Sequence, residues 1–283
     1  MTAFLKTLKM IKIEHSIFAL PFTLASAFLA ANGMPPLLKL GLIVAATVFA
    51  RSAAMAFNRY LDADIDEQNP RTANREIPAG QLSRTYAWRF TVVNGTLFLV
   101  VCAWINQLTL LLAPFMLMVL LGYSYTKRFT SCSHLVLGLA LGLGPVGAWA
   151  AVTGSMSWVP LALGLAVLFW VSGFDMLYAC QDLEFDRKVG LHSTPALLGL
   201  GRTLILARVL HLAMVVILIQ FGLTLDLGVV YFVGTTLLAG LLGYEHYLVW
   251  GGDLSKLGQA FFTMNGMVSI VYGVAVMVAS TMH

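Results

Sequence analysis

Charged residues are scarce in this chain. Lysine, arginine, aspartate and glutamate together make up 11% of its 283 residues, whereas 59% of the residues are hydrophobic. This composition excludes an ordinary soluble domain, in which about a quarter of the residues are charged. Cysteine is also rare. Cys102, Cys132 and Cys180 are scattered and form no CxxC pair, so we expect neither a disulfide framework nor a zinc site.

The hydrophobic residues are gathered into long runs. A helix needs about 20 mostly apolar residues to cross the hydrocarbon of a bilayer, and the chain offers nine segments of roughly this kind. The sequence therefore predicts an all-α, polytopic membrane protein with no room for a sizeable soluble domain. The nine predicted spans cover residues 16–32, 40–58, 87–105, 108–126, 135–152, 158–180, 203–222, 227–249 and 258–280.

The few charges are unevenly placed along the chain. If the N-terminus faces the cytoplasm, every lysine and arginine except Lys39 and Arg51 falls at the inner end of a span or in an inner loop. This positive-inside pattern predicts a cytoplasmic N-terminus and an outer C-terminus. The net charge of +4 therefore reflects membrane topology and does not indicate a nucleic-acid partner. We expect a multi-pass protein of the inner (plasma) membrane.

Two inner connections differ from the short, almost uncharged outer ones. They are long and charged, cover about 59–86 and 181–202, and each follows a helix that ends in acids. A polar residue followed by aspartates four and eight positions later occurs in both, 120 residues apart. This repetition predicts two four-helix halves with a ninth helix added. The residues are Asn58, Asp62 and Asp66 in the first motif and Tyr178, Asp182 and Asp186 in the second.

The two aspartate pairs point to a metal. Residues four apart share one face of a helix, so Asp62 and Asp66 repel each other, as do Asp182 and Asp186. A hard divalent ion such as Mg²⁺ relieves this repulsion, since it takes carboxylate oxygens and keeps other positions for water and phosphate. Two pairs facing each other would hold two ions, and two ions would hold a diphosphate. The alternative is that the acids are solvated or paired with nearby arginines.

The same helical periodicity extends into the membrane. Arg51 lies seven residues before Asn58, and Asp175 lies seven residues before Asp182. Both charges are costly in hydrocarbon and must face a polar cavity or each other. One hypothesis is a structural ion pair between Arg51 and Asp175. The other is a polar floor beneath the metal site, on which a small acidic substrate would place its carboxylate against Arg51.

These motifs resemble the UbiA superfamily of intramembrane prenyltransferases. The first signature of that family, NxxxDxxxD followed by an RTxxR segment, matches the first aspartate motif and "RTANREIPAG" at 71–80. The second, an aspartate pair followed by a basic segment and a proline, matches "QDLEFDRKVGLHSTP" at 181–195. Between them, "YSYTKRFT" at 123–130 is similar to the family's basic loop after the fourth span. The resemblance covers residues 1–283 as a single transmembrane domain.

The resemblance implies nine helices around a central cavity, with both aspartate motifs binding Mg²⁺ and a polyprenyl diphosphate. Lid-like inner loops would close over this site, which would open toward the cytoplasm. The family implies that the metal and diphosphate are held by Asn58, Asp62, Asp66, Asp182 and Asp186. The implied cationic complement is Arg71, Lys127, Arg128 and Lys188, with Arg75 as a further candidate.

This set of residues suits the ionisation of an allylic diphosphate. Divalent ions, arginine and lysine stabilise the charge that gathers on the leaving group, and a cavity within the membrane keeps water from the allylic cation. An electron-rich ring then attacks and a base removes the ring proton, for which Asp175 and Asp182 are both candidates. Nearby aromatic side chains would face the cation or serve in packing: Tyr123, Tyr125, Phe174 and Tyr178.

The segments "MIKIEHSIFALPFTLASAFLA" and "GFDMLYACQD" look most like the 4-hydroxybenzoate polyprenyltransferase branch of the superfamily. That branch implies Mg²⁺-dependent transfer of a polyprenyl group to a small aromatic acid in quinone biosynthesis, as for ubiquinone. It also includes bacterial enzymes that use other aromatic acids, such as a dihydroxynaphthoate in menaquinone synthesis. The sequence does not separate these acceptors.

Two other classes of membrane protein carry charges within their spans. A transporter is expected to place its decisive polar residues near the midplane on broken helices, whereas the acids here cluster at inner helix ends. An alcohol phosphotransferase of phospholipid synthesis is another intramembrane magnesium enzyme, but its continuous acidic motif has no match in this chain. Both alternatives are weaker than a prenyltransferase.

Overall fold

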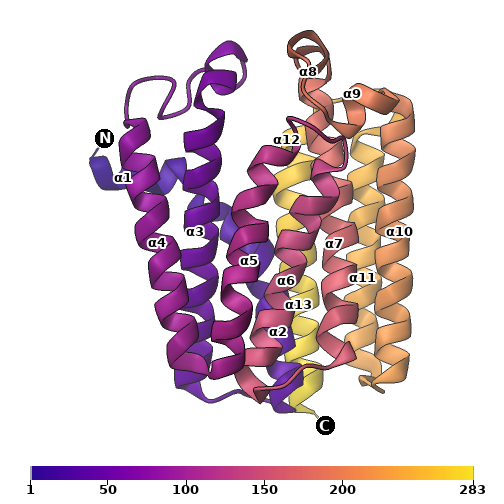
Figure 1. Cartoon of the computed structure of the whole chain (residues 1–283). Coiled ribbons are helices and arrows are strands. Elements are labelled where there is room, and N and C mark those ends of the chain that lie inside the picture. The colour runs from indigo at the N-terminus through magenta and orange to yellow at the C-terminus, as the bar shows by residue number, and fades with distance from the viewer. Residues whose placement is uncertain (1, 283) are drawn as a thin grey trace.

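The computed structural model of the chain describes residues 2–282, with the side chains of residues 17, 259 and 260 outside the description. Within that range the chain has no strand and contains nine helical segments long and apolar enough to cross a membrane. They stand side by side as one bundle (Figure 1). The bounds are α1 Ala3–Met10, η1 Ile13–His15, α2 Ser16–Ala31, α3 Leu37–Gln68, α4 Arg84–Ile105, α5 Gln107–Thr126, α6 Ser133–Thr153, α7 Trp158–Ala179, η2 Cys180–Asp182, α8 Leu183–Val189, α9 Thr194–Leu198, α10 Leu200–Thr224, α11 Gly228–Leu248, η3 Trp250–Gly252, α12 Leu257–Gln259, η4 Ala260–Met264 and α13 Asn265–Thr281.

The predicted spans are confirmed within the described residues, but the ninth is divided among α12, η4 and α13, and the second is longer than expected. α3 has 32 residues, about 48 Å at the helical rise, against a hydrocarbon thickness of about 30 Å. No glycine or proline interrupts it between Gly41 and Pro70, and Pro70 disfavours a helical conformation at the preceding residue, Asn69, which is extended. The expected start of the inner connection at about 59 is therefore wrong, since it begins at Asn69.

The second long connection is also mostly helical. α7 ends at Ala179, one tight turn, η2, carries the chain to Asp182, and α8 then runs to Val189. Gly190, with φ of 72°, ends α8, because a left-handed residue cannot continue a helix. The predicted loop at 181–202 thus contains α8, α9 and the start of α10. Asp182 and Asp186 consequently lie on two different helical segments.

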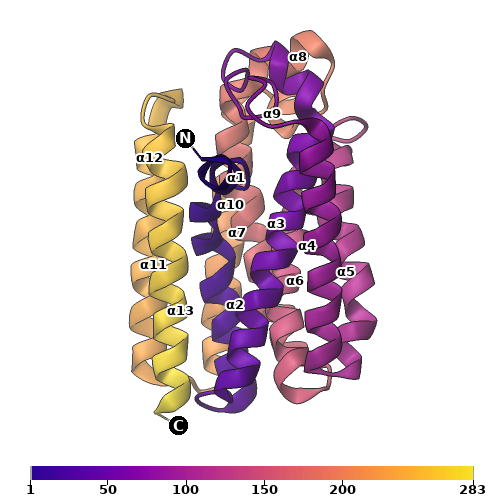
Figure 2. The same ribbon diagram turned by 90° about the vertical axis from the view of Figure 1, so that its left-hand side faces the viewer.

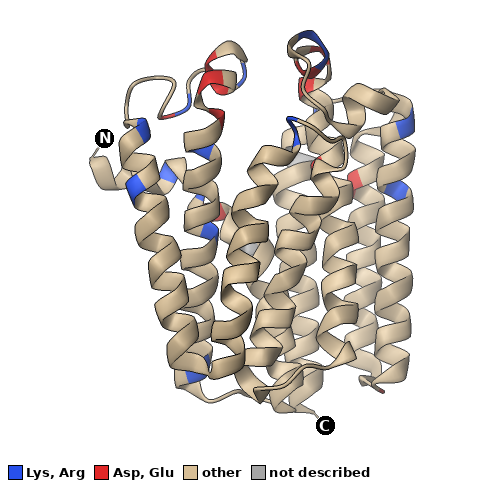
Figure 3. Cartoon of the chain, viewed as in Figure 1, with Lys and Arg blue, Asp and Glu red and all other residues tan. Residues whose placement is uncertain are grey.

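Both aspartate motifs project from the same end of the bundle. Figure 3 shows acids and bases gathered on the segments that rise above the other helices there. We call this part, formed by residues 62–83, 127–132 and 182–193, the charged end. The N-terminus lies on the side of the charged end and the C-terminus at the other end (Figure 1), as an odd number of spans requires. The assignment of the charged end to the cytoplasm stays a prediction.

α6 and α7 pack unusually closely, because glycines face each other along their contact. A Cβ atom built on Gly142 would lie 2.5 Å from the Gly164 carbonyl oxygen, and one on Gly138 would lie 2.4 Å from the Leu168 carbonyl oxygen. Small residues at such positions let membrane helices approach backbone to backbone. The close packing sets the relative register of the two helices near the charged end, where residue 134 of α6 faces residue 175 of α7.

The short helix α1 lies across the bundle, and Figure 2 views it end-on. Met10 and Ile11, at its end, are buried. The carbonyl oxygens at and just after the end of α1 have no partners within that helix, and arginines of α3 donate to them. Arg59 donates to the oxygen of Met10, and Arg51 donates to those of Ile11 and Lys12. The N-terminal segment is thereby fastened to α3.

Candidate active site

A cavity of about 620 Å³ lies inside the bundle beneath the charged end. Its deeper part is apolar and runs between α3, α4, α5 and α6 as far as Ile43, Ile105 and Ala151. Along α3 it reaches from Asn58 to Ile43, a descent of about 22 Å at the helical rise. Its upper part carries Arg51, Asn58, Arg59, Arg75, Tyr123, Asp175 and Tyr178. The cavity is therefore shaped for a long apolar chain with a polar group at its mouth.

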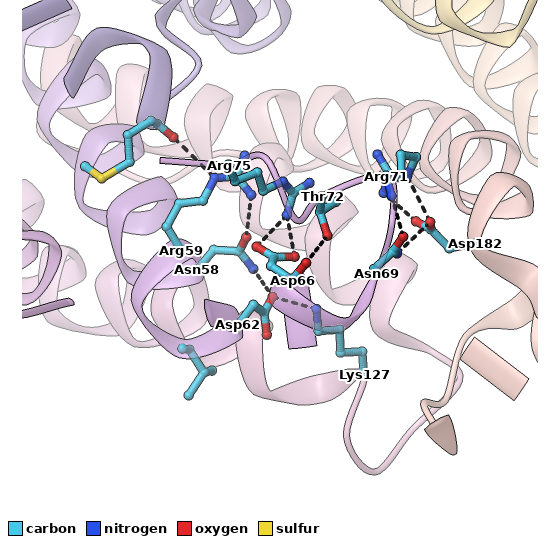
Figure 4. Close-up of polar contacts among 12 residues, drawn as sticks. Asn58, Arg59, Asp62, Asp66, Asn69, Arg71, Thr72, Arg75, Lys127 and Asp182 are labelled. Atoms are coloured by element: carbon cyan, nitrogen blue, oxygen red, sulfur yellow. Dashed lines mark hydrogen bonds and ion pairs between the residues drawn. The ribbon is translucent and has the colours of Figure 1, made fainter. Parts of the chain in front are cut away.

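Asp62 of the first motif is buried and surrounded by donors (Figure 4). Asn58 Nδ2, one turn earlier, donates to its Oδ2 at 2.9 Å. From the connection after α5, Lys127 Nζ lies 2.5 Å from Oδ2 and Arg128 Nη2 lies 3.0 Å from Oδ1. A carboxylate buried in a membrane protein needs such partners. The predicted association of Asn58, Asp62, Lys127 and Arg128 is present in the structure.

Asp66 lies one turn further along α3 and has its own cation. Arg75 Nη1 lies 2.7 and 2.8 Å from the two carboxylate oxygens of Asp66. The hydroxyl of Thr72 donates to the backbone oxygen of Asp66 at 3.0 Å, which folds the segment after Pro70 back over the end of α3. Arg75 also lines the cavity. Its guanidinium therefore lies between the first motif and the space below.

The loop after the first motif holds the second motif. Arg71 Nε donates to Asp182 Oδ1 at 2.8 Å, Arg71 Nη2 pairs with Asp182 Oδ2, and Asn69 Nδ2 donates to Oδ1 at 3.0 Å. Arg71 Nη1 also donates to the hydroxyl of Tyr178 at 3.0 Å. Burial lowers the pKa of Arg71, but the hydrogen bonds and charge of Asp182 outweigh it and raise that pKa. The two motifs are thus joined through a permanently charged guanidinium (Figure 4).

Asp186 and Lys188 stand apart from these contacts. Asp186 Oδ2 accepts a hydrogen bond from the hydroxyl of Ser193 at 2.7 Å, and Ser193 also caps α9. Lys188 is exposed on α8 and makes no ion pair or hydrogen bond with the aspartates in the described part of the chain. Of the predicted cationic complement, Lys188 alone is not brought to a predicted acid.

The aspartates are held singly rather than gathered around a common point. Between residues 2 and 282, no group of three or more histidine, cysteine, aspartate or glutamate side chains is placed to hold a metal ion. Three of the four carboxylates form ion pairs with lysine or arginine side chains, and the fourth accepts a hydrogen bond from a hydroxyl group. The donors nonetheless fit a hard divalent ion, because four carboxylates lie at the charged end and such ions prefer oxygen ligands.

Below the charged end, Arg51 and Asp175 both line the cavity but do not pair. Arg51 Nη1 donates to the Ile11 carbonyl oxygen at 3.2 Å and Nη2 donates to that of Lys12 at 2.9 Å. Asp175 Oδ2 lies 2.6 Å from His134 Nδ1 instead. The hypothesis of an Arg51–Asp175 ion pair is therefore wrong for the described residues. The neighbour of Asp175 is a side chain of α6, brought there by close packing.

Sequence reasoning missed several residues of the site. His134 begins the fifth span and has no pattern that marks it, and Asn69 and Ser193 look like ordinary loop residues. Arg59 follows Asn58 directly and so lies off the stripe that carries the acids, yet it is 5% exposed and lines the cavity. The signal for Arg59 was available, because an arginine at the edge of a predicted span is expensive to bury and needs a reason.

Fold and site together define a polytopic membrane protein with a largely apolar internal cavity, which lies beneath a cluster of aspartates and their cationic partners. Residues 19–267 match the UbiA prenyltransferase family, and the chain belongs to that family. It is therefore a prenyltransferase, as the two motifs predicted. It is 32% identical over 257 residues to the 4-hydroxybenzoate octaprenyltransferase of Photobacterium profundum, across 90% of this chain and 89% of that protein.

Solved structures have the same fold. A UbiA homologue from Aeropyrum pernix K1, determined in its apo form, superposes with a TM-score of 0.86 at 35% identity, over 94% of this chain and 98% of that one. A UbiA homologue from Archaeoglobus fulgidus, determined with DMAPP and Mg²⁺, superposes with a TM-score of 0.76 at 21% identity, over 96% and 99% of the two chains. The predicted all-α fold with nine spans is confirmed for residues 2–282.

Proposed function

We propose that the chain transfers a polyprenyl group from a polyprenyl diphosphate to a small aromatic acid of the 4-hydroxybenzoate type, with Mg²⁺ as cofactor, in quinone biosynthesis. The observation that carries this proposal is the bridge between the motifs above the cavity, where Asn69 and Arg71 both hold Asp182. A diphosphate bound at this bridge would adjoin both motifs, while its apolar chain entered the cavity. The relative from Photobacterium is named for the transfer of an octaprenyl group to 4-hydroxybenzoate.

The residues proposed to hold the metal are Asp62, Asp66, Asp182 and Asp186. When bound, Mg²⁺ would supply positive charge that neutralises the diphosphate of the donor. The cations that now engage these carboxylates, Lys127, Arg128, Arg75 and Arg71, are proposed to contact the diphosphate oxygens.

The protein's own cations would assist the departure of diphosphate. As the bond between the allylic carbon and the ester oxygen breaks, both electrons leave with the oxygen and negative charge accumulates there. Arg71, Lys127 and Arg128 already lie beside the aspartates, so their positive charges are near the place where that negative charge would develop. Asn58, which lines the cavity and donates to Asp62, lies where the polar head of the donor would meet its apolar chain.

The acceptor is proposed to lie in the upper cavity between Arg51 and Asp175. Arg51 is fixed by the carbonyl oxygens of Ile11 and Lys12 and has further donors for the carboxylate of an aromatic acid. Asp175 lines the cavity, whereas Asp182 does not and is engaged by Arg71. We therefore assign the removal of the ring proton to Asp175.

His134 is proposed to position that base. Its Nε2 accepts from the backbone N–H of Thr194 at 3.4 Å, so the proton of a neutral ring is on Nδ1, which then donates to Asp175 at 2.6 Å. The hydrogen bond leaves the second oxygen of Asp175 to take the proton from the ring. The wider setting is proposed to be the inner membrane with the charged end in the cytoplasm, supported by the basic residues at that end.

The experiment is a reconstituted assay with defined substrates. Purified protein in lipid vesicles would be incubated with Mg²⁺, a long-chain polyprenyl diphosphate, and either 4-hydroxybenzoate or a dihydroxynaphthoate. Prenylated product would be identified by mass and released diphosphate measured in parallel. We expect prenylated 4-hydroxybenzoate, and none after chelation of Mg²⁺. If only the dihydroxynaphthoate gives product, the proposed acceptor changes to that compound. If neither acid gives a metal-dependent product, the proposal is rejected.

A further inference from the structure

Aromatic rings form one wall of the upper cavity. Phe18, Phe174, Tyr178 and Phe261 all line the cavity, and we call them the aromatic wall. Phe261 is at the centre, with its ring centroid 4.2 Å from that of Tyr178, 5.4 Å from that of Phe174 and 5.6 Å from that of Phe18. Because Tyr178 accepts a hydrogen bond from Arg71, the wall adjoins the bridge between the aspartate motifs.

The backbone that carries Phe261 is irregular. Phe261 lies in η4, a single π-helical turn directly before α13. Such a turn interrupts the regular α-helical hydrogen bonds and is common at functional sites. The carbonyl oxygen of Phe261 accepts a hydrogen bond from the side-chain amide of Asn265, at 3.1 Å from Nδ2. The position of Phe261 therefore depends on how the Asn265 amide is held.

Two buried side chains fix the Asn265 amide from different helices. Trp170 Nε1, on α7, donates to Asn265 Oδ1 at 2.6 Å, and Asn265 Nδ2 donates to Glu245 Oε1, on α11, at 2.8 Å. Trp170 and Asn265 are 0% exposed and Glu245 is 1% exposed. A donor on one side of the amide and an acceptor on the other allow only one of its two flipped orientations. We call these three residues the amide network.

Burying the side chain of Glu245 costs free energy that a neutral hydrogen-bond acceptor would not. An acid within a membrane span is costly and is retained where it has a function, and no lysine or arginine pairs with Glu245 in the described part of the chain. Its second oxygen, Oε2, is buried and has no hydrogen-bond partner between residues 2 and 282. Packing alone would be served better by an apolar side chain. The hydrogen bond that Glu245 accepts from Asn265 is the contact that its carboxyl group makes in the structure.

We propose that the amide network is a positioning device for the prenyl-transfer reaction, holding Phe261 so that the aromatic wall shields the allylic cation from water. The inference rests on the proposed function and deepens it. Neither Glu245 nor Trp170 lines the cavity, so the network acts through Phe261 and not by touching substrate. Ring faces carry partial negative charge and attract a cation, and closely packed rings would limit the access of water to it.

The cation has two fates, and the wall is proposed to decide between them. When diphosphate leaves with the electron pair of the C–O bond, the acceptor ring can form a carbon–carbon bond and lose its proton to the base. Alternatively, a water oxygen can bond to the same carbon and lose a proton, which yields a prenyl alcohol. The first fate consumes one acceptor per diphosphate released, whereas the second releases diphosphate without consuming acceptor.

The test measures the ratio of prenyl alcohol to prenylated acceptor in vesicles holding the whole protein, with Mg²⁺, a polyprenyl diphosphate and 4-hydroxybenzoate. Asn265→Leu removes all the hydrogen bonds of the amide while keeping a similar volume. We expect the fraction of diphosphate release that yields alcohol to rise at least about fivefold, the equivalent of one lost hydrogen bond. A merely structural role would lower the amount of active protein and leave this fraction unchanged, because both products come from the same active molecules.

Matched variants separate the network from general damage to the bundle. Glu245→Leu is expected to raise the alcohol fraction and Glu245→Gln to restore it, because the glutamine oxygen still accepts from Asn265. Tyr272→Phe is the control: it lies two turns further along α13, is fully buried, and loses only the hydroxyl contact to Tyr231. An unchanged alcohol fraction in both Asn265→Leu and Glu245→Leu would overturn the inference, as would an equal rise in Tyr272→Phe.

The outcome for the wild-type protein keeps the two proposals distinct. If the unaltered protein forms neither product from any donor, the proposed function fails and the positioning role falls with it. If it forms prenylated acceptor and the variants do so with the wild-type alcohol fraction, the proposed function stands and the positioning role of the amide network is rejected.

Discussion

The two aspartate motifs have the same spacing in sequence but differ in how the fold supports them. The first is on the uninterrupted end of α3, and its acids are met by cations from elsewhere, with Lys127 and Arg128 on Asp62. The second is divided between a tight turn and α8, and Asp182 depends on Arg71 from the loop of the first motif. The first motif is therefore supported without the second, whereas Asp182 of the second motif is held through the loop of the first.

This asymmetry also extends into the cavity. Below the first motif α3 carries a base, Arg51, fastened to backbone oxygens, and below the second motif α7 carries an acid, Asp175, beside a histidine. The two similar motifs therefore lie above cavity residues of opposite charge. Under the proposed function the α3 side recognises the anionic acceptor and the α7 side removes its proton, so the difference assigns distinct tasks to two similar helices.

The largest expected effect is the loss of a proposed metal ligand from either aspartate motif. Asp62→Asn and Asp182→Asn are each expected to lower turnover by at least about a hundredfold, because each removes a proposed metal ligand and leaves cations unmatched. The measurement is prenylated product per folded protein, with folding checked by gel filtration in detergent. Near-normal turnover of either variant would remove that aspartate from the site.

A smaller but more informative effect is expected from Arg71→Lys. Lysine retains the charge but lacks the planar fork that lets Arg71 contact both oxygens of Asp182 and the Tyr178 hydroxyl together. We expect turnover to fall by about ten- to thirtyfold, as for two lost charge-assisted hydrogen bonds only partly replaced.

Arg75→Lys is the matched comparison for Arg71→Lys, since Arg75 serves Asp66 within the first motif alone. If the second motif depends on the first, Arg71→Lys is the more harmful change. Equal losses in the two variants would contradict the asymmetry between the motifs.

These contacts also mark how far the sequence could lead. The spans follow from the lengths of hydrophobic runs, and the position of Asp62 and Asp66 on one helical face follows from their spacing. The extension of α3 was also readable in principle, because only Pro70 ends it. Arg71 and Asp182 were predicted to belong to one site, but their ion pair was not predicted. The spacing of residues within one segment does not indicate which residue of another segment they contact.

The contacts that sequence reasoning missed cross between helices. His134 meets Asp175 because glycines let α6 and α7 approach closely, and Asn265 meets Glu245 and Trp170 through the packing of three helices. The sequence of a hydrophobic helix does not indicate how that helix is positioned along its neighbour. The division of the fold into two four-helix halves stays a prediction, since the common spacing of the motifs is its only support.

A substitution of Arg51, in the cavity below the first motif, is expected to change the choice of acceptor more than turnover. Arg51→Met keeps much of the length of the side chain but removes every donor. Hydrogen bonds to charged groups contribute about 1.5–3 kcal/mol, so we expect the KM for 4-hydroxybenzoate to rise by at least about tenfold with a smaller change in kcat. An acceptor of similar shape without a carboxylate is the control, and its KM is expected to stay near the wild-type value. An unchanged preference between the two acceptors would exclude Arg51 from acceptor recognition.

The smallest expected effect comes from Tyr178→Phe, at the point where the second motif meets the aromatic wall. The substitution keeps the ring against Phe261 and the face toward the Arg71 guanidinium, which lies 5.2 Å from the ring centroid. Only the hydroxyl that accepts from Arg71 is lost, and Arg71 keeps both oxygens of Asp182. Because one neutral acceptor contributes about 0.5–1.5 kcal/mol, turnover should fall by about two- to tenfold. Tyr178→Leu removes the ring as well and is expected to add a rise in prenyl alcohol. If Tyr178→Phe already produced that rise, the hydroxyl and not the ring would be what keeps water from the cation, and the second motif would control the wall more directly than the packing of the rings suggests.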